Sequence, residues 1–195
     1  KRIVHAVQVG DPAQLHYTYD LDNGAVAQLW KGNFLNTSPM WDNRGDGSSR
    51  PEGPILAFDD VSPVVAKVDL FVLKPSITEP EAQYTPKGYD LDAAGLPTFR
   101  FQRFGMDVQD HLQVTDGKMI TRTLTFDKIP VGQSYVCRLA IGEKIEQSAE
   151  NTWFVDGKRY YVQLPEGMKP VIEQSGNISV MYVPVATQVV YSILW

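Results

Sequence analysis

Short runs of β-branched and aromatic residues recur along the chain, and Gly, Pro, Asn or Asp separates most runs from the next. Such runs are typical of β-strands. Between Leu15 and Leu21, apolar side chains occupy the odd positions and polar side chains the even positions. This alternation places one face of the strand on a core and the other in water, which is typical of an antiparallel sheet.

The same pattern predicts most of the secondary structure. Steps such as Asn23-Gly24 and Asp116-Gly117 tolerate the positive φ that tight hairpins need. Segment 143–151 fits one or two helical turns at most, because it lacks a wide apolar stripe. The expected strands are Ile3–Val9, Leu15–Leu21, Ala25–Trp30, Pro54–Phe58, Lys67–Leu73, Thr98–Phe104, Met106–Val114, Met119–Phe126, Ser134–Ile141, Thr152–Val155, Arg159–Gln163, Val171–Gln174, Ile178–Val183 and Gln188–Leu194.

These elements predict an all-β protein, a mostly antiparallel β-sandwich with long loops and little helix. The length of 195 residues suits a single β-sandwich domain over 1–195, which buries enough surface to fold without a metal or a disulfide. Two segments break the strand rhythm, at about 32–53 and 74–97, and both are rich in turn-forming residues. Excursions of this length are uncommon in a compact domain unless they are functional or linking.

Composition and charge exclude several classes of protein. The net charge of -5 at pH 7 argues against a nucleic-acid partner, because such proteins present a basic face. Cys137 is the only cysteine, which excludes an internal disulfide, and its strand-like surroundings predict a buried, inert thiol. No apolar run approaches the roughly 20 residues that span a bilayer, so no membrane span is expected.

The richest chemistry lies in and just before the excursion at 32–53. Tryptophan rings cover the apolar C–H face of a sugar, while charged and amide groups hydrogen-bond its hydroxyls. The same residues also fit a well-ordered structural loop, in which the tryptophans plug one end of the sandwich and the arginines pair with carboxylates. The candidate ligand-binding residues are Trp30, Asn33, Trp41, Asp42, Arg44, Asp46 and Arg50.

Other residues give weaker indications of a metal site or a catalytic site. A calcium loop that starts at Asp42 would need oxygen ligands at its third and twelfth positions, where the chain has Arg44 and Gly53. The histidines His5, His16 and His111 show no metal-ligand spacing, so neither a metal nor another cofactor is expected. The acidic pairs Asp59-Asp60, Asp90/Asp92 and Asp107/Asp110 fit turns or solvated faces.

Two stretches carry a family resemblance. They are Trp30-x-Gly32-x-Phe34-Leu35-x-x-Ser38-Pro39-Met40-Trp41-x-x-Arg44-Gly45-Asp46 and Gly88-Tyr89-x-Leu91-Asp92-x-x-Gly95-x-Pro97-Thr98-Phe99-Arg100-Phe101. Together they resemble a β-rich module of large secreted bacterial proteins that also carry c-type cytochrome or sugar-dehydrogenase-like propeller domains, mainly in Bacteroidetes and Planctomycetes. The resemblance implies a periplasmic or extracellular setting and a link to carbohydrate metabolism. The chain has no Cys-x-x-Cys-His, so it does not itself attach haem covalently.

Three functional hypotheses remain open. The first is a non-catalytic accessory domain of a secreted bacterial protein, which binds a saccharide or docks a neighbouring domain through the 30–50 loop. A first residue that is not Met agrees with a mature secreted chain or a piece of a longer protein. The second is a glycoside-active enzyme, a hydrolase or epimerase-like protein, and the third is a purely structural domain. For the enzyme, the candidate acids and bases are Asp42, Asp46, Asp60, His16 and His111.

Overall fold

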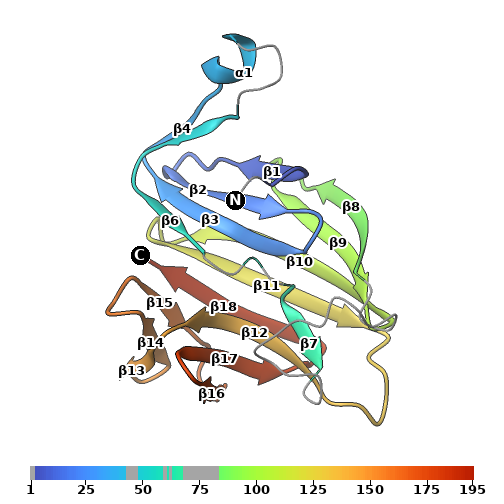
Figure 1. Ribbon diagram of the computed structural model, residues 1–195. Coiled ribbons are helices and arrows are strands. Elements are labelled where there is room, and N and C mark those ends of the chain that lie inside the picture. The colour runs from blue at the N-terminus through green and yellow to red at the C-terminus, as the bar shows by residue number, and fades with distance from the viewer. Residues whose placement is uncertain (1–2, 43–47, 59–60, 62, 68–83) are drawn as a thin grey trace.

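A computed structural model describes residues 3–42, 48–58, 61, 63–67 and 84–195 (Figure 1). Strands make up nearly all of the described secondary structure, and these residues contain one short helix, α1 (Ser38–Asp42). Every strand pairing among them is antiparallel. The predicted all-β, mostly antiparallel fold is therefore confirmed. No helix in the described ranges has the length and hydrophobicity needed to cross a bilayer.

The described strands form three larger sheets and one hairpin. The N-terminal sheet has the order β1 (Ala6–Val9), β2 (Leu15–Asp20), β3 (Ala25–Lys31) and β6 (Ile55–Ala57). The C-terminal sheet has the order β16 (Val171–Ser175), β17 (Ile178–Pro184), β12 (Tyr135–Gly142) and β7 (Val65–Lys67). The long sheet has the order β13 (Ile145–Ala149), β14 (Thr152–Val155), β15 (Tyr160–Gln163), β18 (Gln188–Leu194), β11 (Met119–Asp127), β10 (Met106–Thr115), β9 (Pro97–Arg103) and β8 (Thr85–Leu91). The hairpin pairs β4 (Asn33–Asn36) with β5 (Arg50–Glu52).

The two four-stranded sheets cover the same face of the long sheet, one beside the other (Figure 1). Tyr19 of β2 stacks on Phe99 of β9, with ring centroids 3.7 Å apart. Tyr160 of β15 donates a 3.3 Å hydrogen bond to the carbonyl of Ile141 in β12. The strand registers place Phe99 and Tyr160 on one face of the long sheet. The fold is therefore a two-layer sandwich in which one layer is divided into two sheets.

The core lies between these layers. One continuous cluster of buried apolar side chains draws on all three larger sheets, and Leu29, Leu124 and Met181 are fully buried members of it. On the long sheet, the outward side chains that alternate with the buried ones are polar at many positions, for example Gln109 and Thr123. This is the alternation that the sequence pattern predicted for a half-buried strand.

A central polar cluster, made of Tyr19, Gly24, Asp110, Arg122 and Tyr191, crosses this core. Arg122 on β11 donates from Nε and Nη2 to the carboxylate of Asp110 on β10, at 2.9 and 2.5 Å. The hydroxyl of Tyr19 donates to the same carboxylate at 2.8 Å. Arg122 also donates to the Gly24 carbonyl at 3.2 Å and to the Tyr191 hydroxyl at 3.0 Å. Because buried charges are tolerated only when they are paired and hydrogen-bonded, this cluster restricts how the N-terminal sheet sits on the long sheet.

The burial of Asp110 corrects a prediction. The pair Asp107/Asp110 fitted a turn or a solvated face, and Asp107 does lie at the surface, where it pairs with Lys128. Asp110, however, is fully buried. The alternation of β10 points its side chain inward, and Arg122 on the next strand compensates the charge.

Two segments differ from the predicted elements. Segment 143–151 contains strand β13 rather than helical turns, because its backbone pairs with β14. Residues 85–91, within the predicted excursion at 74–97, form the edge strand β8. The sequence pattern missed β8 because Pro86 and Gly88 interrupt it and most of its side chains are exposed, so no apolar alternation marks it. Residues 68–83, which include most of the predicted strand 67–73, lie outside the described residues.

Cys137 lies on β12 and is fully buried, as predicted. Desolvation by burial is the largest cause that raises the pKa of its thiol to about 12. Since the thiolate is the reactive form, this thiol is protonated and inert at neutral pH.

Replacement of Asp110 by Ala tests the importance of the central polar cluster. The change leaves the Arg122 guanidinium buried without its counter-ion, so we expect the free energy of unfolding to fall by about 3–5 kcal/mol. Urea unfolding at neutral pH measures this loss. The control is Asp90→Ala, which removes an exposed pair with Arg100 and costs about 1 kcal/mol or less. Equal losses in the two variants would contradict the structural role of the buried pair.

Candidate functional site

The described residues of the excursion at 32–53 form an arm that projects from the sandwich (Figure 1). We define the arm as β4, α1 and β5 with the described residues between them, 37, 48 and 49. The strands pair antiparallel, with Asn36 opposite Arg50. The side chain of Asn36 accepts a 2.9 Å hydrogen bond from the backbone N–H of Ser38, which caps the start of α1. At the base of the arm, a Cβ on Gly53 would lie 1.7 Å from the Lys31 carbonyl oxygen, so only glycine fits there.

Trp30 anchors the arm to the body. Its ring is fully buried, and its indole N–H donates to the carbonyls of Asn33 and Phe34 at 3.1 and 2.9 Å. Its ring also stacks on the Phe34 ring, with centroids 5.9 Å apart. Trp30 therefore holds the first strand of the arm, and its ring presents no surface to a ligand.

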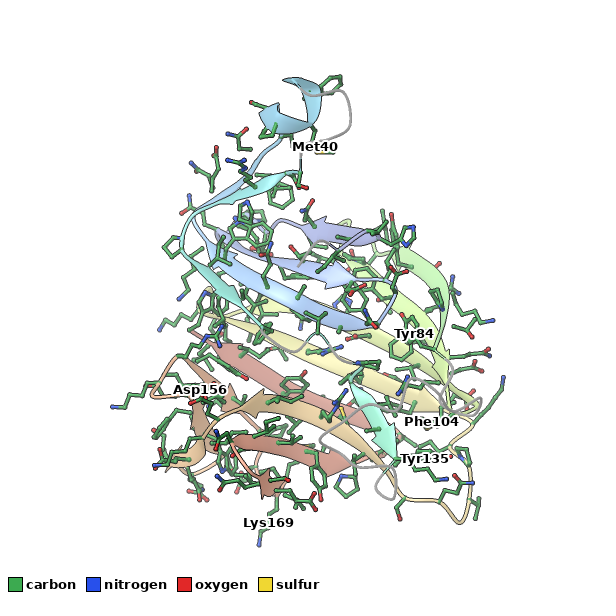
Figure 2. The ribbon with its side chains drawn as sticks, in the orientation of Figure 1. Met40, Tyr84, Phe104, Tyr135, Asp156 and Lys169 are labelled. Atoms are coloured by element: carbon green, nitrogen blue, oxygen red, sulfur yellow. The ribbon has the colours of Figure 1, made fainter. Side chains whose placement is uncertain are left out.

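Trp41 lies on α1 near the tip of the arm and is 82% exposed. Its neighbour Met40 is also exposed, and Figure 2 shows it far from the body of the sandwich. The structure thus separates the two tryptophans that the sequence analysis grouped together. Trp30 matches the structural interpretation of the loop, whereas Trp41 is accessible to a ligand or partner.

The structure describes only some of the other predicted binding residues. Asn33 and Arg50 lie on opposite strands of the arm and are exposed. Asp42 is the last residue of α1, and its side chain is not among those described. Arg44 and Asp46 lie outside the described residues.

A groove of about 530 Å³ lies at the base of the arm, and we call it the motif groove. Phe34 belongs to the first motif stretch, and Tyr89 and Leu91 belong to the second. The fold thus brings together two stretches that are far apart in the sequence. The lining residues are Val7, Gln8, Val9, Gly10, Asp11, Pro12, His16, Phe34, Tyr89, Leu91, Gly95 and Pro97.

The motif groove is mainly apolar and keeps two rings partly exposed. Phe34 is 40% exposed and Tyr89 is 45% exposed, while Leu91 is 61% exposed. Gly10 allows Phe34 to approach closely, since a Cβ on Gly10 would lie 2.9 Å from the ring. Tyr89 packs edge-on against Phe99, which fixes its ring on β8. Tyr89 and Leu91 are not among the binding residues predicted from the sequence, although both stand in the second motif.

The two histidines proposed as acids or bases do not meet. His16 is buried, its Nδ1 accepts from the Asp11 backbone N–H at 3.1 Å, and its Nε2 lies 2.9 Å from the Gly32 carbonyl. Both ring nitrogens are therefore engaged in holding backbone. His111 lies on the outward face of the long sheet, where it contacts the Thr98 hydroxyl. Asp60 and Asp46 are outside the described residues, so the enzyme hypothesis gains no assembled acid–base pair among the described ones.

No protein-family model matches the chain, and no curated protein matches it significantly. The resemblance to the secreted bacterial module therefore remains a prediction based on the two motif stretches.

Replacement of Trp41 by Phe tests the exposure of the arm. We expect the variant to lose most of the tryptophan emission that acrylamide quenches readily, because Trp41 is 82% exposed. Stern–Volmer quenching measures this fraction. The matched control is Trp153→Phe, which removes a ring that is 7% exposed and leaves the readily quenched fraction unchanged. A similar effect of both replacements would show that the arm folds back onto the body.

Proposed function

We propose that the protein is a non-catalytic accessory domain of a larger secreted bacterial protein, and that it docks a neighbouring domain through the arm and the motif groove. The observation that carries this proposal is the meeting of the two motif stretches at one apolar groove, at the base of an arm whose tip carries an exposed tryptophan. Folding alone does not need Trp41 or Leu91 at the surface. Exposed apolar groups gathered in one region are typical of surfaces that another protein covers.

The chemistry of the motif groove favours a protein partner over a polar ligand. Apolar groups dominate its lining, and Asp11 is the one acidic or basic residue besides His16 among the described lining residues. Aromatic and Met side chains are enriched at protein interfaces, and Phe34, Tyr89, Met40 and Trp41 supply them here. An apolar segment of a neighbouring domain would gain from burial against these rings.

The periplasmic or extracellular setting and the link to carbohydrate metabolism belong to the same proposal. Their support is the resemblance of the two motif stretches to modules of large secreted bacterial proteins. In such a protein, a domain that positions its neighbours needs an interaction surface but no catalytic residues.

Site-specific photocrosslinking in the complete natural polypeptide tests the docking proposal. A photoreactive benzoylphenylalanine in place of Trp41 is expected to crosslink to a peptide of another domain of the same polypeptide, identified by mass spectrometry. The control position is Val131, which is 99% exposed and lies between β11 and β12, away from the arm. Docking through the arm is excluded if position 41 gives no crosslinks beyond those obtained at position 131.

A second candidate for the same surface is a saccharide, favoured by the exposed indole of Trp41. An indole that stacks on a sugar ring contributes much of the affinity, so Trp41→Ala should weaken such binding by about tenfold or more. Isothermal titration with glucose, galactose, mannose and cellobiose measures this change. Binding that Trp41→Ala leaves unaffected would remove the arm as the sugar site.

A further inference from the structure

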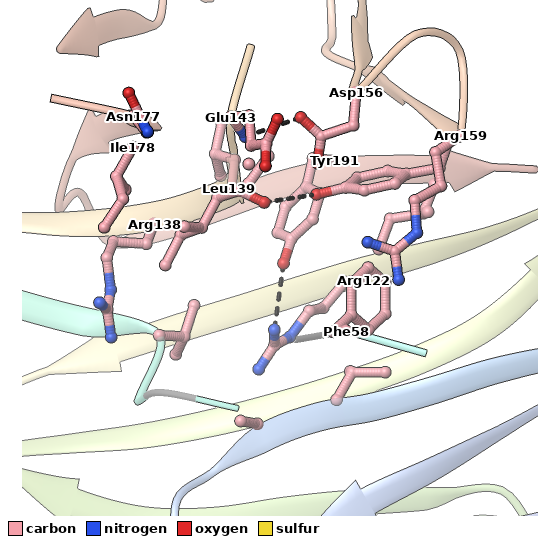
Figure 3. A pocket seen from close by; sticks show the side chains of 18 residues that line it. Phe58, Arg122, Arg138, Leu139, Glu143, Asp156, Arg159, Asn177, Ile178 and Tyr191 are labelled. Carbon is pink, nitrogen blue, oxygen red and sulfur yellow. Dashed lines mark hydrogen bonds between the residues drawn. The ribbon is translucent and has the colours of Figure 1, made fainter. Parts of the chain in front are cut away.

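The second layer of the sandwich is divided, and a cleft of about 800 Å³ lies at the division (Figure 3). The cleft is separate from the arm and the motif groove. Its walls come from the N-terminal and C-terminal sheets and from the connections that flank them, and its floor is the middle of the long sheet. Small-molecule sites typically have volumes of about 300–1,000 Å³, so the cleft suits a ligand of one or two rings.

The floor of the cleft presents hydrogen-bond donors. An arginine side chain has five N–H groups. Among the described residues, the partners of Arg122 are the Asp110 carboxylate, the Gly24 carbonyl and the Tyr191 hydroxyl, which leaves a second N–H on Nη1. The Tyr191 hydroxyl accepts from Nη1, so its own proton is available to a ligand oxygen (Figure 3). Burial is the largest cause that raises the Tyr191 pKa to about 12, and the hydroxyl therefore stays a donor at neutral pH.

Asp156, at the rim of the cleft, is a fixed hydrogen-bond acceptor. Its Oδ1 accepts from the backbone N–H groups of Glu143 and Lys144, at 2.7 and 3.0 Å. The carboxylate also lies directly over Gly142, where a Cβ would be 2.7 Å from both of its oxygens. These contacts hold the carboxylate in place and leave Oδ2 without a hydrogen bond to any described residue. Figure 3 shows Asp156 and Glu143 together at the rim.

Apolar groups complete the cleft. Phe58 packs edge-on against the ring of Tyr160, with centroids 5.4 Å apart. Leu139 and Ile178 line the C-terminal side. Such surfaces cover the C–H groups of a ligand while the polar groups bind its oxygens.

Among the described residues, the three cations of the lining are matched in number by three anions, one of which, Asp110, lies beneath the floor and not in the lining. Asp110 beneath the floor compensates Arg122. The two remaining cations, Arg138 and Arg159, are matched in number by the anions Glu143 and Asp156. A cleft whose described cations and anions are equal in number, and which offers both donors and an acceptor, favours a ligand whose groups donate and accept at once, as hydroxyls do.

We propose that this cleft is a binding site for a small, uncharged, polyhydroxylated ligand, such as a monosaccharide or disaccharide. The ligand hydroxyls would accept from Arg122 and Tyr191 and donate to Asp156. This proposal does not depend on docking through the arm, and either can fail without the other.

Isothermal titration of the purified chain with glucose, galactose, mannose and cellobiose tests the site. We expect saturable binding of at least one probe. Asp156→Asn keeps an oxygen for the two backbone N–H groups but replaces the free acceptor by an N–H₂ donor, so it should weaken binding by about tenfold or more. Tyr191→Phe removes the hydroxyl donor and should weaken binding to a similar degree.

The matched control for Asp156 is Asp92→Asn. Asp92 also accepts two backbone N–H groups through Oδ1, from Ala94 and Leu96, but it lies in an exposed turn away from the cleft. This variant should leave the affinity unchanged. A lower melting temperature of Tyr191→Phe would mean that this variant is destabilised and cannot report on binding. The comparison of Asp156→Asn with Asp92→Asn then tests the proposed site by itself.

Three outcomes would overturn the proposal. They are the absence of saturable binding by the unaltered chain, binding that Asp156→Asn leaves unchanged, and a preference for glucuronate over glucose. Loss of binding in Trp41→Ala but not in Asp156→Asn would place the sugar on the arm instead.

Discussion

The pair formed by Asp110 and Arg122 restricts how the layers of this protein are assembled. Both side chains are almost fully buried, and a charge in such a place must be compensated. Further hydrogen bonds stabilise the two charges. Tyr19 in the N-terminal sheet donates to Asp110, and Arg122 donates to the Gly24 carbonyl beside that sheet and to Tyr191 on the long sheet. An apolar core tolerates small rotations of one sheet over another, but a bidentate ion pair with further hydrogen bonds accepts a narrow range of positions. The cluster therefore sets the place of the N-terminal sheet.

That placement explains why the molecule has two separate candidate binding surfaces. The C-terminal sheet occupies the rest of the same face, and the boundary between the two sheets is the cleft above Arg122 and Tyr191. The arm emerges at the end of β3, where the buried ring of Trp30 and the close backbone contact at Gly53 hold its base. The cleft has directed polar groups and, among the described residues, cations and anions in equal number, whereas the motif groove is largely apolar. We therefore propose different partners for the two surfaces, a small polar ligand for the cleft and a protein for the motif groove.

Much of the strand pattern was predictable, because alternation and turn residues act locally. Strands β10, β11 and β18 follow their apolar alternation closely. In β2 the prediction of one face in water was wrong, because His16, Thr18 and Asp20 are buried as well. The strands that the sequence pattern did not predict were missed for local reasons as well. Segment 143–151 has no alternation strong enough to reveal β13, and β8 is an exposed edge strand with a proline. Of the predicted binding residues, Trp30 ends an apolar strand segment and is fully buried, whereas Trp41 precedes a polar run and is 82% exposed.

The sequence alone determined the fold class, the hairpin turns and the buried state of Cys137, because periodicity, backbone preference and local hydrophobicity are properties of neighbouring residues. Tertiary structure decided which strands share a sheet, which motif stretches meet and which charged groups are buried together. Those features depend on contacts between residues as distant as Tyr19 and Asp110, or Phe34 and Tyr89, and no local pattern encodes the pairing. The cleft is a clear case, since its donors and its acceptor come from strands and turns that become neighbours only when the two layers pack.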